Sequence, residues 1–269
     1  MRSQKDERID LSTKKAWEEN WQGVGLARIM EIFEYPRVKE NIGIFLSFLP
    51  RGKRILEGGC GLAPYVIYLR RMGYDVIGVD YNEEPLRKAR EFEPGIDLRC
   101  GNVEKLPFPD GHFGGYLSLG VIEHFTEGPQ KAVLEAFRVL EPGGVFIVKV
   151  PRTTIFEMVS LPVTVIKNNR FLRKILGKTP PEEHYWEQRF SVGELRSVLE
   201  RSGFSVEKII PVDQEHALMV FSGIFRDKST YDGPSRLCVA ATKWCKKLMP
   251  WISAPGVVFI CRKNYGGDK

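Results

Sequence analysis

Residues 55–63 read ILEGGCGLA, and this stretch decides the fold that the chain predicts. It has the form of a short buried strand, a glycine turn and the start of a helix, and the next apolar strand ends at Asp80. Glycines in such a turn let the backbone come within contact distance of a ligand, where a Cβ atom would collide. An acid at the tip of the following strand is placed to accept hydrogen bonds from both hydroxyls of a ribose. Together these features predict an adenosine-type cofactor at the strand ends of an α/β sheet.

The glycine spacing separates two kinds of cofactor. A dinucleotide-binding turn requires Gly-x-Gly-x-x-Gly, in which the third glycine lets the helix pack closely on the strand. Here Gly59 and Gly61 are followed by Pro64, which the first turn of a helix tolerates but which is not the small residue required. The spacing from Glu57 to Ala63 fits the pattern acidic-x-Gly-x-Gly-x-Gly/Ala instead. A nicotinamide-dependent oxidoreductase is therefore disfavoured.

This pattern resembles the signature of class I S-adenosylmethionine-dependent methyltransferases. The match extends over residues 53–150, where it is closest to the subgroup that includes ubiquinone/menaquinone and many small-molecule methyltransferases. The resemblance implies that the glycine turn packs against the methionine portion of S-adenosylmethionine and that Glu57 lies near its amino group. It also implies that the reaction product is S-adenosylhomocysteine.

Further landmarks follow at the places that the family leads us to expect. Asp80 matches the ribose-binding acid, and the pair Asn102-Val103 matches the acidic and hydrophobic residues that meet the adenine, with asparagine keeping the acceptor of the commoner aspartate. Residues 113–124 match the fourth strand and its exit, although Gly114 stands where an aspartate is common. The cofactor-binding residues that the resemblance implies are Glu57, Gly59, Cys60, Gly61, Asp80, Tyr81, Asn102, Val103, Leu119 and Gly120.

Short apolar runs alternate with helical lengths, which predicts βαβ units. The expected fold is a Rossmann-like, doubly wound α/β sheet, mostly parallel with an antiparallel last strand, helices on both faces and helical lid insertions. The expected strands are 53–57, 75–79, 96–100, 113–119, 144–150, 204–210 and 257–261, and the expected helices include 63–73, 83–92, 127–140 and 191–202. The expected organisation is an N-terminal helical arm over 1–35, a cofactor-binding core over 36–151, a lid insertion over 152–190, the core continued over 191–210, a second insertion over 211–253, and a last core strand and tail over 254–269.

The composition is ordinary for a globular protein and mildly basic. The chain has 269 residues, 43% hydrophobic and 28% charged, with a formal net charge of +6. Its five cysteines include no Cys-x-x-Cys pair, and Cys60 and Cys100 fall where buried strand-end residues are expected. These features favour free thiols in a reducing cytoplasm, and the four histidines show no metal-ligand spacing, so no metal is expected. The polar N-terminus and the lack of a long apolar run predict neither a signal peptide nor a transmembrane helix.

Methyl transfer from a sulfonium is an in-line displacement, so the protein mainly positions two reactants and excludes water. A hydroxyl or carbon-acid acceptor also needs a base. His124, just beyond the fourth strand, is the first candidate, and His184 and Tyr185 in the first insertion are the others. Each can instead be a structural residue of a helix start or a packed loop.

The insertions are expected to select the acceptor. Residues 155–176 combine apolar side chains with a basic end, which is typical of a lid and also of a segment that touches a membrane surface. The expected acceptor is a small apolar or lipid-like molecule methylated on oxygen or carbon. A nucleic-acid methyltransferase remains an alternative because of the charge, although no base-pocket motif of the Asn/Asp-Pro-Pro-Tyr type occurs. A non-catalytic scaffold that binds S-adenosylmethionine is another, and the oligomeric state stays open.

Overall fold

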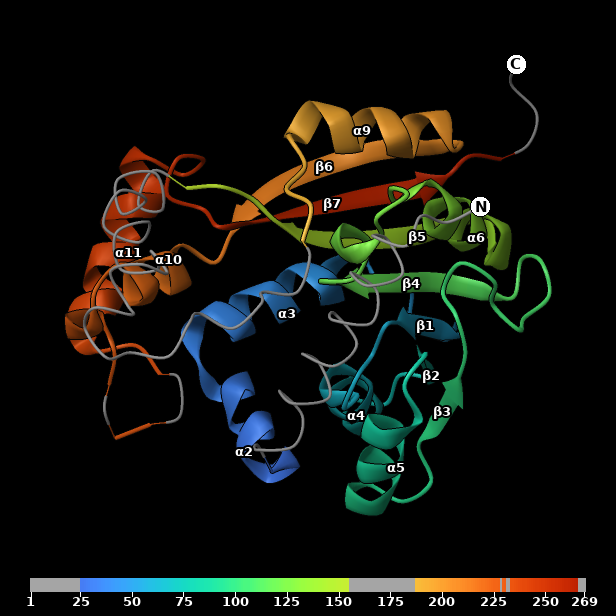
Figure 1. The fold of residues 1–269 in the computed structure, drawn as a ribbon, viewed down its shortest axis with the longest axis horizontal. Coiled ribbons are helices and arrows are strands. Elements are labelled where there is room, and N and C mark those ends of the chain that lie inside the picture. Colours follow the sequence, from blue (N-terminus) through green and yellow to red (C-terminus); the bar gives the residue numbers. More distant parts are fainter. Residues whose placement is uncertain (1–24, 155–186, 228, 231–232, 266–269) are drawn as a thin grey trace, which may run out of the picture.

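The structure is a computed structural model, and it describes residues 25–154, 187–227, 229–230 and 233–265. Its centre is a seven-stranded sheet with the order β3-β2-β1-β4-β5-β7-β6 (Figure 1). The strands are β1 (Ile55–Gly58), β2 (Val76–Asp80), β3 (Asp97–Cys100), β4 (Phe113–Leu119), β5 (Leu140–Pro151), β6 (Phe204–Val212) and β7 (Gly256–Lys263).

The strand directions confirm the predicted fold class. Strands β1 to β5 pair in parallel, whereas β7 pairs antiparallel with both β5 and β6. The strand order reverses between β1 and β4, and a parallel sheet leaves a crevice at the carboxyl ends of its strands where the order reverses. The last strand is the antiparallel one, as expected.

Helices cover both faces of the sheet. The helical elements are α2 (Leu26–Met30), η1 (Glu31–Glu34), α3 (Pro36–Phe48), α4 (Pro64–Arg71), α5 (Glu83–Phe92), η2 (Ile122–His124), α6 (Gln130–Val139), α9 (Val192–Arg201), α10 (Gln214–Phe221), η3 (Gly223–Phe225) and α11 (Arg236–Leu248). Because successive strand side chains point to opposite faces, Ile55 and Leu56 enter two different cores. The first core packs under α2 to α5, and the second packs under α6 and α9.

Most predicted bounds shift by one to three residues, and two further differences from the sequence prediction have a clear physical cause. Strand β5 begins at Leu140 rather than residue 144, because Leu140 already pairs with Phe113 and the glycine-rich residues 141–144 bulge before pairing resumes at Val145. Cys100, expected to be buried, is exposed, because β3 is the edge strand of the sheet and presents its last residues to solvent.

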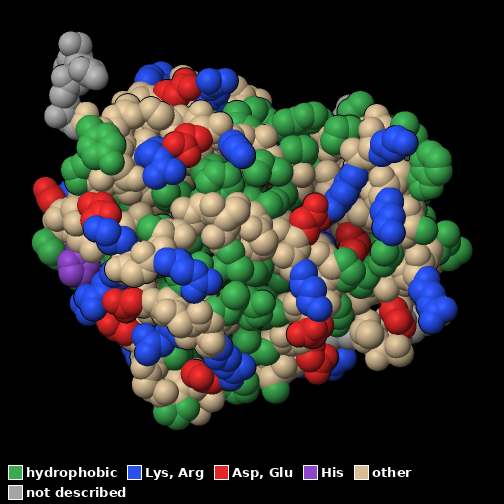
Figure 2. Space-filling view, turned by 180° about the vertical axis from the view of Figure 1, so that it is seen from behind, with side chains coloured by type: hydrophobic (Ala, Val, Ile, Leu, Met, Phe, Trp, Pro, Cys, Tyr) green, Lys and Arg blue, Asp and Glu red, His purple; other side chains and the backbone are tan. Residues whose placement is uncertain are grey.

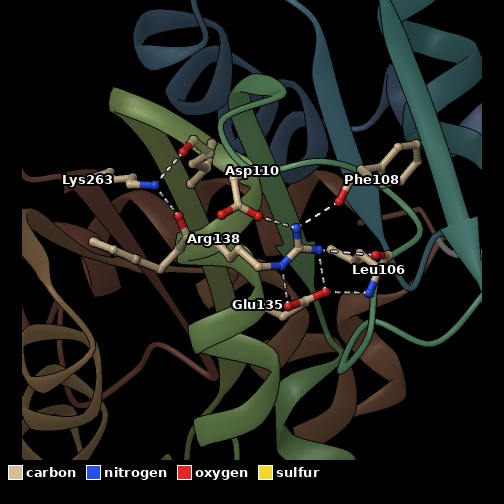
Figure 3. A network of polar contacts seen from close by, with 8 residues as sticks. Leu106, Phe108, Asp110, Glu135, Arg138 and Lys263 are labelled. Carbon is tan, nitrogen blue, oxygen red and sulfur yellow. Dashed lines mark hydrogen bonds and ion pairs between the residues drawn. The ribbon is translucent and has the colours of Figure 1, made fainter.

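A charged network fixes the loop that leads from β3 to β4 (Figure 3). Arg138 at the end of α6 donates to the backbone oxygens of Leu106 (3.1 Å) and Phe108 (2.8 Å). The same guanidinium pairs with Asp110 (2.7 Å) and with Glu135 (2.7 Å), whose carboxylate also accepts from the backbone N–H of Leu106 (2.6 Å). Bidentate guanidinium contacts of this kind are geometrically specific. The network holds the chain that follows residues 102–103 against the body of the protein.

Candidate active site

The glycine turn after β1 has a backbone that ordinary residues avoid. Gly59 has φ +72° and Gly61 has φ +52°, and both lie in the left-handed region. The backbone N–H groups of Gly59 and Cys60 donate to the carbonyl of Val79 over 2.7 and 3.0 Å, which ties the turn to β2. A Cβ atom on Gly59 would lie 2.4 Å from Cγ2 of Val121, just beyond β4. The turn therefore lies between the exits of β2 and β4, the strands on either side of β1, and has no room for a side chain at Gly59.

Asp80 lies at the tip of β2 and braces this turn. Its Oδ2 accepts from the backbone N–H of Gly61 (2.8 Å) and its Oδ1 from that of Asn82 (2.9 Å). Burial raises the pKa of Asp80 above its usual value, while the surrounding backbone N–H groups favour the charged form. The side chain is 7% exposed. The carboxylate thus sits at the carboxyl edge of the sheet, at the position that the resemblance assigns to ribose.

Glu57 is a buried carboxyl with an unsatisfied oxygen. Its side chain lies in β1, and no hydrogen-bond partner among the described residues reaches its Oε2. Burial raises the pKa of Glu57 to about 8, with a backbone hydrogen bond from Val66 opposing the rise and the nearby charge of Asp80 contributing to it. A buried polar atom without a partner is costly, so this oxygen fits a cationic donor such as the amino group of a bound amino acid. The residues present therefore fit the methionine end of S-adenosylmethionine.

The other predicted cofactor residues lie along the same edge of the sheet. Tyr81 follows β2 and is 48% exposed, whereas Val103 is 7% exposed. The side-chain oxygen of Asn102 accepts from the backbone N–H of Glu104 over 2.8 Å, so it already closes a turn. Gly120 follows Leu119 at the end of β4, and its backbone N–H donates to the carbonyl of Lys149 over 3.0 Å. The fold thus brings residues from four strand ends to one edge.

The candidate bases divide into described and undescribed residues. His124 is half-buried at the end of η2, directly beyond β4. His184 and Tyr185 lie outside the described residues.

The neighbour of His124 is the less expected finding: Glu123 is 2% exposed, and its Oε2 has no hydrogen-bond partner in the described part of the chain. Burial, with a smaller contribution from the charge of Glu187, raises the pKa of Glu123 to about 8. From the sequence Glu123 was interpreted as a structural residue, because an exposed acid and a buried acid look alike in sequence.

A second polar cluster was absent from the sequence prediction. Nζ of Lys149, near the end of β5, lies 2.6 Å from Oδ2 of Asp213, which follows β6. The amide of Asn41 in α3 donates to Oδ1 of the same aspartate over 2.8 Å. Burial alone would lower the pKa of Lys149, but the attraction of Asp213 raises it overall, and the pKa of Asp213 is lowered in turn. Burial also raises the pKa of Tyr65, at the start of α4, beside this pair.

This cluster, consisting of Asn41, Tyr65, Lys149 and Asp213, is named the Lys149 cluster below. Lys149 pairs in register with Leu119, so the cluster borders the exit of β4. No group of three or more His, Cys, Asp or Glu side chains that could hold a metal ion occurs within the part of the chain that the structure describes. In the same part, no helix is long and apolar enough to cross a membrane.

Comparisons with known proteins agree with this geometry. Residues 56–148 match the family described as "Methyltransferase domain". A probable S-adenosylmethionine-dependent methyltransferase of Mycolicibacterium smegmatis is 32% identical over 161 residues, which cover 60% of this chain and 55% of the relative. The mitochondrial ubiquinone biosynthesis O-methyltransferase of Rattus norvegicus is 30% identical over 167 residues, covering 59% of this chain and 46% of the relative. The chain thus spans about half the length of these relatives.

A solved structure from Thermotoga maritima, titled as an S-adenosylmethionine-dependent methyltransferase and possible histamine N-methyltransferase, superimposes with a TM-score of 0.59. The superposition covers 96% of this chain and 99% of that one at 21% identity, which shows a shared fold. The glycine turn and the acid after β2 lie within residues 56–148. Residues 56–148 therefore match a methyltransferase domain, and the described part of the chain shares the fold of the Thermotoga maritima protein.

Proposed function

We propose that this protein transfers a methyl group from S-adenosylmethionine to the oxygen or carbon atom of a small amphipathic acceptor. The observation that carries the proposal is the buried Oε2 of Glu57, which no residue in the described ranges hydrogen-bonds, beside Asp80 and the glycine turn. An ammonium group satisfies the buried Glu57 oxygen, and the hydroxyls of a ribose suit the carboxylate of Asp80. Tyr81 and Val103 flank the place of the adenine.

S-adenosylmethionine supplies an activated methyl group on a sulfonium sulfur. In the proposed reaction the bond from sulfur to the methyl carbon breaks, a bond from that carbon to the acceptor atom forms, and the acceptor loses one proton. The ionised form of Glu123, which becomes populated as the pH approaches the pKa of about 8, receives this proton. His124, the candidate named from sequence, is the alternative proton acceptor at the same strand exit. No metal is required for this proton balance.

The Lys149 cluster provides the proposed polar contact for the acceptor. Lys149 holds a positive charge beside the exit of β4, and Tyr65 offers a hydroxyl in the same place. An acceptor with one polar group and an apolar remainder would place the polar group here. The relative from Rattus norvegicus, whose name assigns it to ubiquinone biosynthesis, supports an acceptor of this amphipathic kind. The free state of all five cysteines supports a reducing compartment, and we propose the cytoplasm.

The test is transfer of radiolabelled methyl from S-adenosylmethionine into a fractionated cell extract. We expect label in the lipid or small-molecule fraction with the wild type, little label with Asp80→Ala, and little with Glu123→Gln. Label in RNA, DNA or protein would contradict the acceptor class. Calorimetric binding of S-adenosylmethionine without label in any fraction would point to a non-catalytic scaffold. Calorimetry without any heat of binding would overturn the proposal altogether.

A further inference from the structure

Helix α11 packs with one face and exposes an apolar stripe on another. Its buried residues Cys238 and Cys245 join Leu218 and Met219 of α10 in a small separate core. On the exposed side, Leu237, Trp244 and Leu248 are 52, 65 and 64% exposed. Residues spaced by seven and four positions share one face of a helix. Three large apolar side chains therefore form a continuous stripe on the surface.

Apolar exposure continues at both ends of this stripe. At its N-terminal end, the hydroxyl of Ser235 donates to the carbonyl of Ile224, which places the 65% exposed Ile224 beside the start of the helix. Beyond its C-terminal end, Trp251 is 39% exposed and Ile252 is 53% exposed. Large apolar surfaces of this kind on a protein mark sites of interaction.

The charged residues of α11 and of the segments that flank it in sequence are all basic. Residues 234–256 contain no Asp or Glu but include Arg236, Lys243, Lys246 and Lys247. Lys246 pairs with Glu40 of α3. Lys243 and Lys247 are exposed beside Trp244, and among the described residues no carboxylate pairs with either. On the right of Figure 2, which corresponds to the left of Figure 1 where α10 and α11 lie, basic and hydrophobic side chains lie next to one another. The exposed face made by Leu237, Lys243, Trp244, Lys247 and Leu248 is called the α11 patch.

The α11 patch is physically linked to the candidate active site. The guanidinium of Arg152, directly after β5, donates to the carbonyl of Trp251 (2.6 Å) and lies over its ring, 5.5 Å from the centroid. Gln214, the residue after Asp213, donates from its side chain to the carbonyl of Pro250 over 3.0 Å. Arg152 lies close after Lys149 in the sequence, and Gln214 directly follows Asp213, so both contacts start from residues near the Lys149 cluster. The C-terminal end of α11 is therefore held beside the strand ends at which the acceptor is proposed to bind.

We propose that the α11 patch docks on an anionic lipid surface. An amphipathic helix inserts its apolar stripe at the boundary of head groups and acyl chains, while flanking lysines extend to the anionic phosphates. A second copy of the chain fits less well, because a two-fold pairing of the patch would place its lysines against lysines and offers no acid. Docking by α11 holds the carboxyl edge of the sheet next to the bilayer, where an amphipathic acceptor can enter. Only the entry of the acceptor from the bilayer rests on the proposed function, because lipid binding itself needs no turnover.

The experiment is co-sedimentation of the full chain with vesicles. We compare neutral phosphatidylcholine vesicles with vesicles that contain phosphatidylglycerol, at low and at high salt. We expect binding to the anionic vesicles at low salt and at least about tenfold weaker binding for Lys243→Glu/Lys247→Glu, because each basic residue near an anionic surface contributes about 1 kcal/mol. The apolar variant Trp244→Ser/Leu248→Ser is expected to weaken binding in a salt-independent way. A matched control, Lys131→Glu/Arg201→Glu on α6 and α9, changes the net charge equally and should retain binding.

The outcomes separate this inference from the methyltransferase proposal. Equal vesicle binding by the wild type and both α11 variants, or no binding to anionic vesicles at low salt, would overturn the inference. Sedimentation velocity that shows a dimer of the wild type and a monomer of Trp244→Ser/Leu248→Ser would also overturn it, in favour of a second copy as the occupant. The thermal shift with S-adenosylmethionine should be the same in all variants, so its loss in every protein would contradict the proposed function alone.

Discussion

Asp80 and Gly61 are joined by a hydrogen bond of 2.8 Å from the glycine backbone N–H to the aspartate Oδ2. The acid that is expected to bind ribose therefore also sets the shape of the turn that is expected to hold the methionine portion. Two sequence motifs that lie on different strands act as one unit in the structure. Changing either of them should affect both binding and local stability.

The first prediction concerns Asp80 itself. Asp80→Ala removes both ribose acceptors and frees the backbone N–H groups of Gly61 and Asn82, so S-adenosylmethionine affinity should fall by roughly a hundredfold or more. Asp80→Asn keeps one acceptor and should retain more affinity and a smaller loss of thermal stability. Isothermal titration calorimetry and thermal unfolding measure the two effects. Wild-type affinity in Asp80→Ala would contradict the assignment of this residue.

The second prediction tests the space in the glycine turn. Gly59→Ala would place a Cβ atom 2.4 Å from Cγ2 of Val121 at a backbone φ of +72°. We expect a loss of about 1–3 kcal/mol in the free energy of unfolding, with S-adenosylmethionine binding abolished. Gly43→Ala is the control, because Gly43 lies inside α3 with no atom within 4 Å of the added Cβ, and it should be neutral or slightly stabilising. Similar denaturation midpoints for the two variants would argue against the tight turn.

The third prediction is a proton linkage at Glu57. The free protein holds a proton on Glu57 below pH 8, because burial raises its pKa to about 8. A bound ammonium group would lower this pKa, so binding near pH 7 should release a proton and affinity should rise with pH up to about 8. Calorimetry in buffers of different ionisation enthalpy measures the release. Glu57→Gln should bind S-adenosylmethionine more weakly and without this proton release. The same pH dependence of affinity in that variant as in the wild type would refute the linkage.

The fourth prediction concerns Glu123 and the sign of its effect on stability. An unfolded glutamate has a pKa of about 4.3, whereas the pKa of Glu123 in the folded protein is about 8. Between these two pKa values Glu123 is protonated in the folded state and ionised in the unfolded state. The contribution of Glu123 to the free energy of unfolding is therefore lost as the pH rises from the lower pKa to the higher one. Glu123→Gln should slow methyl transfer yet unfold at higher denaturant than the wild type at pH 8–9. The exposed Glu91→Gln should show neither change, and a faster or unchanged turnover in Glu123→Gln would exclude it as the base.

The fifth prediction separates structure from function in the Lys149 cluster. Lys149→Met leaves Asp213 buried and without its cation, so the free energy of unfolding should fall by about 3 kcal/mol. Lys149→Met/Asp213→Leu removes both charges and should regain most of that stability. If Lys149 contacts the acceptor, the double variant stays impaired in methyl transfer while S-adenosylmethionine binding is normal. Full activity of the stable double variant would assign the pair a purely structural role.

Local sequence patterns determined the βαβ order, the glycine turn and the acid after β2. Each of these is set by residues close together in the chain. An apolar run forms a buried strand, and Gly59 adopts a left-handed backbone conformation that residues with a side chain avoid. The predicted bounds of α5 match the structure, because Asn82 provides an N-cap whose side chain accepts from the backbone N–H of Glu84. Burial at the sheet edge did not follow from local pattern, so Cys100 was predicted wrongly.

Only the tertiary structure revealed that Glu57 and Glu123 are buried carboxyls, each with an oxygen that no described residue hydrogen-bonds. It also revealed that Lys149 meets Asp213 across 63 intervening residues. The same holds for the exposed stripe of α11, whose cysteine face is buried only because α10 packs against it. The physical reason is that the pKa of an acid, the partner of a cation and the exposure of an apolar face depend on which distant segments pack around them. A linear sequence specifies the residues, but solvent exclusion and charge pairing arise when the sheet brings strand ends from across the chain to one edge.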